Sequence, residues 1–180
     1  MPSSALSCLK VIDLTQIMAG PFCTLLLADM GAEVIKVEKP GVGDDTRKMG
    51  PPFIKNESAA FLSINRNKRS IVIDLKQADG IEIMKTLIET ADVLVQNFRP
   101  QTLDRLGLGY ESVREINPSI VYCSISGFGN TGPYKDKGGF DLIAQGMSGL
   151  MSVTGSEGNM PTKVGVPITD LSAGLYAAYG

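Results

Sequence analysis

The chain has 180 residues, of which 43% are hydrophobic and 20% charged, and its formal net charge is -2. That length is enough for one domain with a sizeable core, and the composition excludes a disordered or collagen-like chain. The near balance of charge excludes an overall positive field that would attract nucleic acid or an anionic membrane. The chain contains no histidine, which excludes a histidine-dependent triad or an imidazole metal site within it.

The cysteines favour a reducing compartment. Cys8, Cys23 and Cys123 are odd in number and far apart, which is typical neither of a disulfide framework nor of a zinc site. The first nine residues lack the features of a secretory signal, and no run of eighteen apolar residues predicts a membrane span. We therefore expect a cytoplasmic protein that holds no metal and binds neither nucleic acid nor membrane.

Strands alternate with helices along the chain. A strand at 11–14 precedes a helix that Gly20–Pro21 open and Gly31 ends, and a strand at 33–38 follows. Such a βαβ unit predicts an α/β fold with a parallel sheet. The polar, glycine-rich stretch 40–56 predicts a surface loop. The remaining predicted elements are strands at 70–74, 92–95 and 120–125 and helices at 80–89, 103–106, 110–116, 140–150 and 170–180, the last with Thr169 as its N-cap.

The last predicted helix has no ending signal. Its apolar pattern of Leu171, Leu175 and Ala178 is still running at Gly180, and no C-cap residue follows. We therefore expect the chain to be the N-terminal part of a longer protein.

One glycine motif resembles a dinucleotide fingerprint. Gly127 to Gly132 spells G-x-G-x-x-G after a predicted strand, but the fingerprint requires an apolar helix to begin there. Residues 133–139 instead predict a loop. We therefore favour a mobile glycine loop over a nicotinamide or flavin site.

Basic residues gather where predicted strands end. In an open α/β sheet, ligands bind beyond the carboxyl ends of the strands, where Lys39 and the segment 97–99 lie. Basic groups there suit a phosphorylated ligand, and Phe98 suits contact with a base ring. Ordinary solvated charge is the alternative for any single residue. The full set comprises residues 65–69, Lys39, Arg47, Arg99 and Arg105.

Asp170 has two interpretations. A carboxylate in the first turn of a helix complements the helix dipole and caps free N–H groups. The same N–H groups would also hold it ionised and aimed for covalent attack on a thioester carbonyl, with Ala173 and Gly174 allowing a ligand to approach closely. We interpret the remaining lone acids as structural: Asp13, Asp29, Asp74 and Asp104.

Ordered blocks of the chain resemble the class III CoA-transferases, the CaiB/BaiF family. The resemblance covers nearly the whole sequence. Its blocks are residues 9–15, 19–21, 27–38, 43–44, Arg47, 67–70, 97–98, 103–105, 127–129, 131–133 and Asp170.

The resemblance implies a fold, substrates and an assembly. Residues 1–180 would form, incompletely, the Rossmann-like CoA-binding N-terminal domain, a parallel sheet with flanking helices, and the second domain would be absent. The full-length family members form interlocked homodimers. They use acyl-CoA and a carboxylic acid acceptor as substrates and need no prosthetic group. The nearest subgroup is the one that moves CoA between dicarboxylic acids.

The resemblance also assigns roles to residues. The family's nucleophile falls on Asp170, whose carboxylate would form an acyl-aspartyl anhydride and then an aspartyl-CoA thioester. The CoA crevice would be lined by Ile17, Met18 and Ala19. The remaining CoA contacts would be Lys39 near the adenosine, Asn97 and Phe98 along the chain, Arg105 at the phosphates, Asn67 and Lys68 in the basic set, and Lys137 with Phe140 near the thioester.

The chain departs from the racemases that share this fold. Those enzymes use a histidine in a Gly-His-Asp segment, and here the corresponding stretch is Gly139–Phe140–Asp141. Without that acid/base partner, a two-base exchange of the α-proton is not available. We therefore prefer an acyl-CoA:carboxylate CoA-transferase. A 2-methylacyl-CoA racemase-type isomerase and a catalytically inactive CoA-binding fragment remain alternatives, and we expect the isolated 180 residues to be inactive because the family builds its site between two chains.

Overall fold

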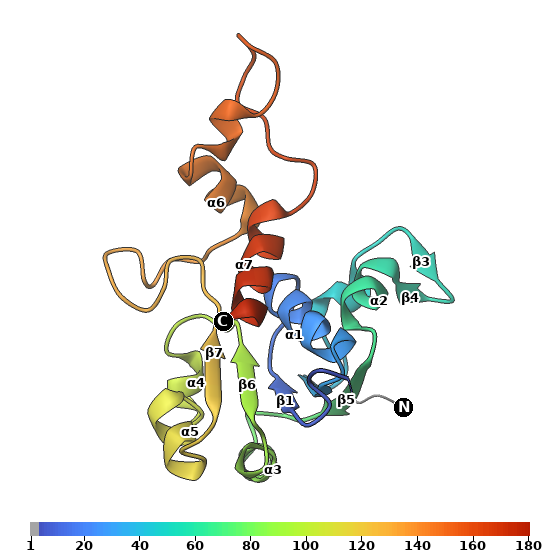
Figure 1. The fold of residues 1–180 in the computed structure, drawn as a ribbon, viewed down its shortest axis with the longest axis vertical. Coiled ribbons are helices and arrows are strands. Elements are labelled where there is room, and N and C mark those ends of the chain that lie inside the picture. Colours follow the sequence, from blue (N-terminus) through green and yellow to red (C-terminus); the bar gives the residue numbers. More distant parts are fainter. Residues whose placement is uncertain (1–3) are drawn as a thin grey trace.

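A computed structural model describes residues 4–180, and its centre is a five-stranded parallel sheet (Figure 1). Residues 1–3, at the start of the segment in which we expect no secretory signal, lie outside the described residues. The strands are β1 (Lys10–Asp13), β2 (Glu33–Glu38), β5 (Lys68–Val72), β6 (Val93–Gln96) and β7 (Val121–Ser124). Their order is β5-β2-β1-β6-β7. The predicted α/β fold with a parallel sheet is thereby confirmed.

The strand order reverses at β1. The chain builds outward from β1 through β2 to β5 on one side, and through β6 to β7 on the other. A crevice at the carboxyl ends of the strands accompanies such a reversal and is where ligands bind in doubly wound sheets. The loops that leave β1 and β6 therefore border the expected binding site.

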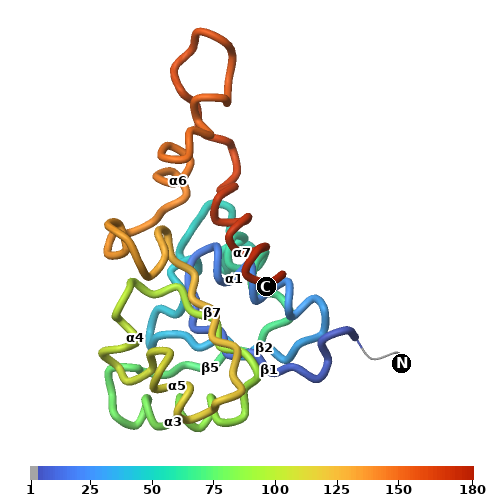
Figure 2. Tube along the Cα trace, turned by 60° about the vertical axis from the view of Figure 1, so that its left-hand side comes forward, coloured from blue at the N-terminus to red at the C-terminus, as the bar shows by residue number. Residues whose placement is uncertain are grey.

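Helices cover both faces of the sheet, as Figures 1 and 2 show. On one face, α1 (Ala19–Asp29) and α7 (Ile168–Tyr179) pack on a cluster that contains Val11, Val34 and Val95. The other face, with Ile12 and Leu94, is covered by α3 (Ala78–Glu89), α4 (Thr102–Arg105) and α5 (Tyr110–Ile116). Alternate residues of each buried strand thus feed two separate cores.

The stretch 40–56 is more ordered than the sequence predicts. It contains the 3-10 helix η1 (Asp45–Lys48) and strand β3 (Phe53–Ile54), which pairs with β4 (Glu57–Ser58). The helix α2 (Ala59–Asn65), which the sequence analysis missed, begins after Ser58, whose side chain accepts from the N–H of Phe61. Asp44 and Thr46 are fully buried, so this segment is not simply a surface loop.

Residues 125–167, between β7 and α7, extend away from the sheet (Figure 2). Residues 127–139 contain no helix or strand, as predicted, and α6 (Asp141–Met147) and η2 (Leu150–Val153) replace the single predicted helix. The predicted starting residues of α1 and α7 also differ from those observed. Pro21 is the third residue of α1, and Pro167, not Thr169, precedes the first residue of α7.

Within residues 4–180, none of the helices combines the length and the apolar character needed to cross a membrane.

Candidate active site

A groove of about 390 Å3 lies at the carboxyl edge of the sheet, beside the point where the strand order reverses. It brings together three of the predicted binding residues, Lys39, Phe98 and Arg105. Gln16, from the turn after β1, and Lys76 also line it. These residues come from four separate segments of the chain, and only the fold places them together.

The groove combines apolar walls with basic groups. The apolar part is formed by Leu14, Val37, Ile73, Leu75, Phe98 and Leu106. Arg105 also borders an adjoining hollow of about 420 Å3, which Arg99 lines as well. Lys39 forms an ion pair with Asp45. An apolar slot with cationic groups around it suits a flat heterocycle that carries phosphates.

The turn after β1 borders this groove and has an unusual conformation. Ile17 has a φ of 71°, a left-handed value that a branched side chain rarely adopts. The side chain of Asn97 donates to the carbonyl of Gln16 at 2.7 Å and accepts from the N–H of Gln16 at 2.8 Å. We expected Asn97 to contact the ligand, but the structure gives its amide a different role, which is to hold the turn that lines the groove.

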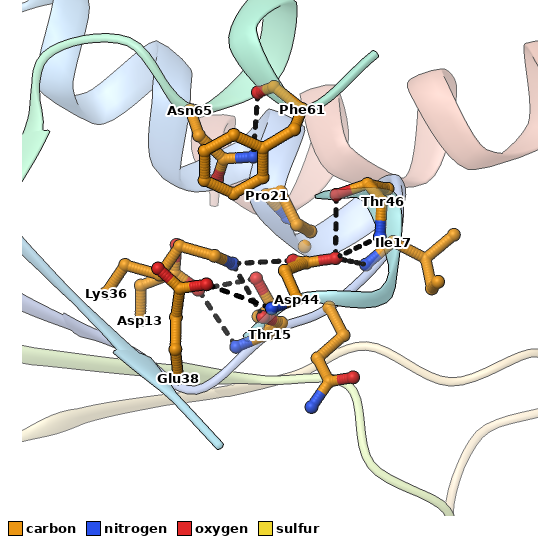
Figure 3. A network of polar contacts seen from close by, with 12 residues as sticks. Asp13, Thr15, Ile17, Pro21, Lys36, Glu38, Asp44, Thr46, Phe61 and Asn65 are labelled. Carbon is orange, nitrogen blue, oxygen red and sulfur yellow. Dashed lines mark hydrogen bonds and ion pairs between the residues drawn. The ribbon is translucent and has the colours of Figure 1, made fainter. Parts of the chain in front are cut away.

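A network of buried charges lies beneath this turn (Figure 3). Lys68, whose side chain is 2% exposed, bonds to Asp13 at 3.1 Å, to the carbonyl of Pro21 at 2.8 Å and to Asn65 at 2.9 Å. Burial lowers the pKa of Lys68 to about 8, against the attraction of Asp13. Although burial raises it, the ammonium groups of Lys68 and Lys36 hold the pKa of Asp13 below its ordinary value.

Lys68 and Asn67, which we expected to contact CoA, do not line the groove. All three ammonium protons of Lys68 are engaged inside the protein, so none remains for a CoA phosphate. Asn67 lies just before β5, at the opposite edge of the sheet from the groove, and donates to Asp29 at 2.8 Å. The interpretation of Asp13 as a structural acid is consistent with its full burial.

Glu38, at the end of β2, is a groove carboxylate with a strongly lowered pKa. Burial raises its pKa, but hydrogen bonds from Arg47, from Ser70 and from the N–H of Asp44 together lower it to about 2. Arg47 grips Glu38 with two nitrogens at 2.7 Å each and lies 3.7 Å above the ring of Phe61. This bidentate pair fixes η1 beside the groove.

Asp170 lies in the first turn of α7, which packs closely on α1. A Cβ on Gly174 would lie 2.4 Å from the carbonyl oxygen of Ala19. Asp170 precedes Gly174 by one helical turn and shares its face of α7. The contact corrects our expectation for Gly174, because it accommodates the backbone of α1 rather than a ligand. Since α1 begins directly after the turn that borders the groove, α7 packs on the end of α1 that is nearest to the groove.

The carboxylate of Asp141 organises the start of α7. Asp141 accepts from the N–H of Thr169 at 2.9 Å and from its hydroxyl at 2.7 Å, and Gln145 donates to its other oxygen at 2.6 Å. Thr169 therefore binds to α6 instead of capping its own helix. Although burial raises the pKa of Asp141, these bonds together hold it below its ordinary value.

The ionisation of Asp170 differs from the sequence-based expectation. We expected the helix N–H groups to favour the charged form, whereas burial, and next the charge of Asp141, raise the pKa of Asp170. The side chain of Asp170 is half-buried, and Pro167, the residue before α7, makes no side-chain hydrogen bond that caps the helix. Its environment therefore resembles that of a reactive carboxylate more than that of a helix cap.

The loop that contains Lys137 lies beside the groove, because its residue Asp136 lines the adjoining hollow together with Arg99 and Arg105. Lys137 lies 4.2 Å above the ring of Tyr134, and the side chain of Phe140 is 66% exposed. A Cβ on Gly127 would lie 2.3 Å from the Cα of Gly139, so the two ends of the loop touch. The structure does not bring Lys137 to the groove or to Asp170.

Sequence analysis missed Gln16, Lys76, Asp44 and Asp141 as parts of the site. Gln16 is adjacent to the predicted crevice residues, and Asp141 belongs to the segment that we compared with the racemases. Lys76 lies just after the predicted strand at 70–74, and ligands bind at such strand ends in open α/β sheets. For Asp44, the sequence around it predicted no role, although residues 43–44 are one of the blocks that resemble the CaiB/BaiF family.

Comparisons with known proteins agree with this geometry. The profile of CoA-transferase family III matches residues 6–180. Succinyl-CoA:glutarate CoA-transferase from Homo sapiens is 53% identical over 171 residues, which are 95% of this chain and 39% of that protein. Succinate–glutarate CoA-transferase from Agrobacterium fabrum is 51% identical over 178 residues, which are 96% of this chain and 44% of that protein.

A solved structure shows the same fold. The crystal structure of a CaiB/BaiF family protein from Brucella suis superposes with a TM-score of 0.95 at 46% identity, over 98% of this chain and 48% of that one. The chain thus spans less than half the length of the relatives that it matches. With a parallel sheet, a groove at its switch point and a profile match over residues 6–180, the chain belongs to family III of the CoA-transferases.

Proposed function

We propose that the native protein is an acyl-CoA:carboxylate CoA-transferase in which Asp170 is the nucleophile. The observation that carries this proposal is the placement of Asp170. It is a half-buried carboxylate with a raised pKa, on a helix that packs through Gly174 against the helix that starts at the groove.

The groove supports the binding of CoA. Its apolar walls suit the adenine ring, with Phe98 as the aromatic partner, and Lys39, Lys76 and Arg105 supply positive charge for the phosphates. The pantetheine chain would then run past the turn at residues 16–19 toward Asp170. This path places the thioester at the point where α1 and α7 meet.

The reaction follows from the position of the carboxylate. An oxygen of Asp170 attacks the thioester carbon, the C–S bond breaks with its electron pair on sulfur, and an acyl-aspartyl anhydride and CoA thiolate result. The thiolate attacks the aspartyl carbonyl, releases the donor acid and leaves an aspartyl-CoA thioester. The acceptor carboxylate attacks this thioester and expels CoA thiolate, which forms a second aspartyl anhydride. The thiolate then attacks the acceptor's carbonyl in that anhydride, which gives the new acyl-CoA and frees the carboxylate of Asp170. The raised pKa makes the ionised carboxylate of Asp170 a better nucleophile.

The relatives suggest the substrates. Two of them are named for succinyl-CoA or succinate and glutarate, so we propose a dicarboxylic acid donor and acceptor. We also propose that residues 1–180 are the N-terminal CoA-binding domain of a longer, cytoplasmic protein that forms an interlocked homodimer. Asp170 and the CoA thiol suffice for the chemistry, so no prosthetic group is invoked.

The test is to trap the covalent intermediate. The full-length protein is incubated with succinyl-CoA, denatured, and its peptides are mapped by mass. We expect an adduct on the peptide that contains Asp170, which hydroxylamine removes, and none in Asp170→Asn. If CoA binds to the wild-type protein but no adduct forms, the transferase proposal is wrong. Deuterium exchange at the α-carbon of a 2-methylacyl-CoA would then identify a racemase-type activity, and its absence a CoA-binding module.

A further inference from the structure

Side chains from three other elements hold every backbone polar group between the carbonyl of Thr15 and the N–H of Ile17. Lys36, on β2, donates to the carbonyl of Thr15 at 2.9 Å. Asn97, after β6, brackets both polar groups of Gln16. The carboxylate of Asp44, after β2, accepts from the N–H of Ile17 at 3.2 Å. The shape of this turn is therefore imposed from outside.

The turn needs such support because of Ile17. Its φ of 71° lies where L-residues other than glycine pay about 1–2 kcal/mol. A β-branched residue is among the least suited to this region. Strained backbone of this kind persists only where its surroundings over-determine it.

Asp44 is the centre of the support (Figure 3). Its side chain is buried, and only donors face it. One oxygen accepts from the N–H of Ile17, from the N–H of Thr46 at 2.9 Å and from the hydroxyl of Thr46 at 2.7 Å. The other oxygen lies 2.8 Å from the ammonium group of Lys36. One carboxylate thus ties the turn after β1 to η1 and to β2.

We propose that Asp44 is a positioning residue for CoA binding. It touches no ligand and acts through Ile17, whose left-handed conformation directs Gln16 to the groove and lets α1 begin at Ala19. This inference rests on the proposed function, because it takes CoA as the ligand of the groove. Buried ion pairs of this kind contribute more to a defined geometry than to net stability.

Asp44→Asn breaks the clamp without leaving a cavity. Donors surround both oxygens of Asp44, so an amide NH2 must face a donor in either orientation. We expect the amide proton of Ile17 to exchange with solvent at least tenfold faster in this variant. We expect the Kd for CoA, measured by calorimetry on the full-length protein, to rise about tenfold, which is about 1.4 kcal/mol. Asp44→Ser is smaller and brings no opposing NH2. It should also raise the exchange rate at Ile17 and the Kd for CoA, and it replaces Asp44→Asn if that variant does not fold.

A matched control and a rescue separate positioning from general stability. Thr46→Val removes one bond to the same oxygen but leaves the N–H of Ile17 bonded, so both readouts should stay within twofold of wild type. Ile17→Gly removes the cost of the left-handed conformation, so Asp44→Asn should weaken CoA binding much less in the Ile17→Gly background than in the wild-type background. A positioning role is expected to show this coupling in a double-mutant cycle.

The outcomes are distinct. Unchanged CoA affinity in a folded Asp44→Asn or Asp44→Ser protein would overturn the inference, as would a loss of affinity that is equally large in the Ile17→Gly background. If the wild-type protein itself does not bind CoA, the proposed function fails. Exchange at Ile17 still reports on the clamp in that case, and unchanged exchange in the Asp44 variants refutes it independently.

Discussion

Two segments leave the carboxyl edge of the sheet, and they are built in opposite ways. The turn after β1 is bonded to side chains from other elements at Thr15, Gln16 and Ile17. The loop after β7 is open, and residues 131–140 are all exposed. In the loop, glycines such as Gly129 and Gly132 adopt positive φ, with nothing near the place of a Cβ. In the turn after β1, Ile17 adopts a φ in the same positive range.

The comparison shows how the turn that borders the groove keeps its conformation. Glycines adopt left-handed conformations at little cost, so they need no support and provide none. The turn reaches the same conformation with a branched residue, because Asp44 and Asn97 hold it from distant parts of the chain. A glycine motif therefore marks the open segment in this protein, and the segment that borders the groove carries no such motif.

The largest effect is expected at the junction of the two segments. Thr169 binds Asp141, which follows the open loop, and Gly174 packs on α1, which follows the bonded turn. Asp170→Ala should lower the rate of CoA transfer by at least about 10³-fold, because it removes the nucleophile. The Kd for CoA should change less than threefold. A variant that still transfers CoA at the wild-type rate would contradict the assigned role.

The buried carboxylate of Glu38 should also govern the stability of the protein at low pH. The pKa of Glu38 is about 2 in the folded protein, whereas the ordinary value of 4.5 applies in the unfolded chain. Because the folded pKa is the lower one, this stabilisation is present above pH 4.5 and is lost as the pH falls toward 2. The free energy of unfolding should drop by about 3 kcal/mol over that range.

Glu38→Gln should remove this part of the pH dependence in chemical denaturation experiments. Asp136→Asn, in the exposed loop, serves as the control and should behave as wild type. If both variants keep the wild-type pH profile, another carboxyl group is responsible for the loss of stability.

A pair of glycine substitutions compares the two segments directly. A Cβ on Gly20 would lie 2.3 Å from the Cβ of Thr15, whereas on Gly138 it would approach no atom closer than 3.8 Å. Gly20→Ala should cost about 2 kcal/mol of stability through overpacking and weaken CoA binding. Gly138→Ala should change both by little, as thermal unfolding and calorimetry would show. Equal effects in the two variants would remove the distinction between a bonded turn and an open loop.

The smallest of these effects is expected in the groove. Arg105→Gln should weaken CoA binding about tenfold, because one charge-assisted contact to a phosphate is worth about 1.5 kcal/mol. The loss should be smaller for dephospho-CoA if Arg105 contacts the 3′-phosphate. Arg69→Gln is the matched control, since Arg69 is exposed and pairs with Glu33. A similar loss in both variants would indicate a general effect of charge.

Much of the fold could be predicted from local pattern. Apolar runs with helical or strand spacing identified all five sheet strands and most helices, because burial imposes that spacing. The missed elements, η1, β3, β4 and α2, are short, and the contact between Arg47 of η1 and Phe61 of α2 is one that no local pattern contains. The nucleophile candidate and the basic groups at strand ends were predicted, but the roles of Lys68 and Asn97 were not. Those roles depend on partners 55 and 81 residues away, which no local pattern contains.

The touching ends of the loop after β7 have an evolutionary consequence. Because Gly127 and Gly139 meet at a single point, the residues between them can be lengthened, shortened or exchanged while the strand before them and the helix after them stay in place. Such a segment can diversify quickly among paralogues, while the sheet and the helices that pack on it change slowly. Loops from relatives that are grafted between these two glycines should therefore leave the fold intact.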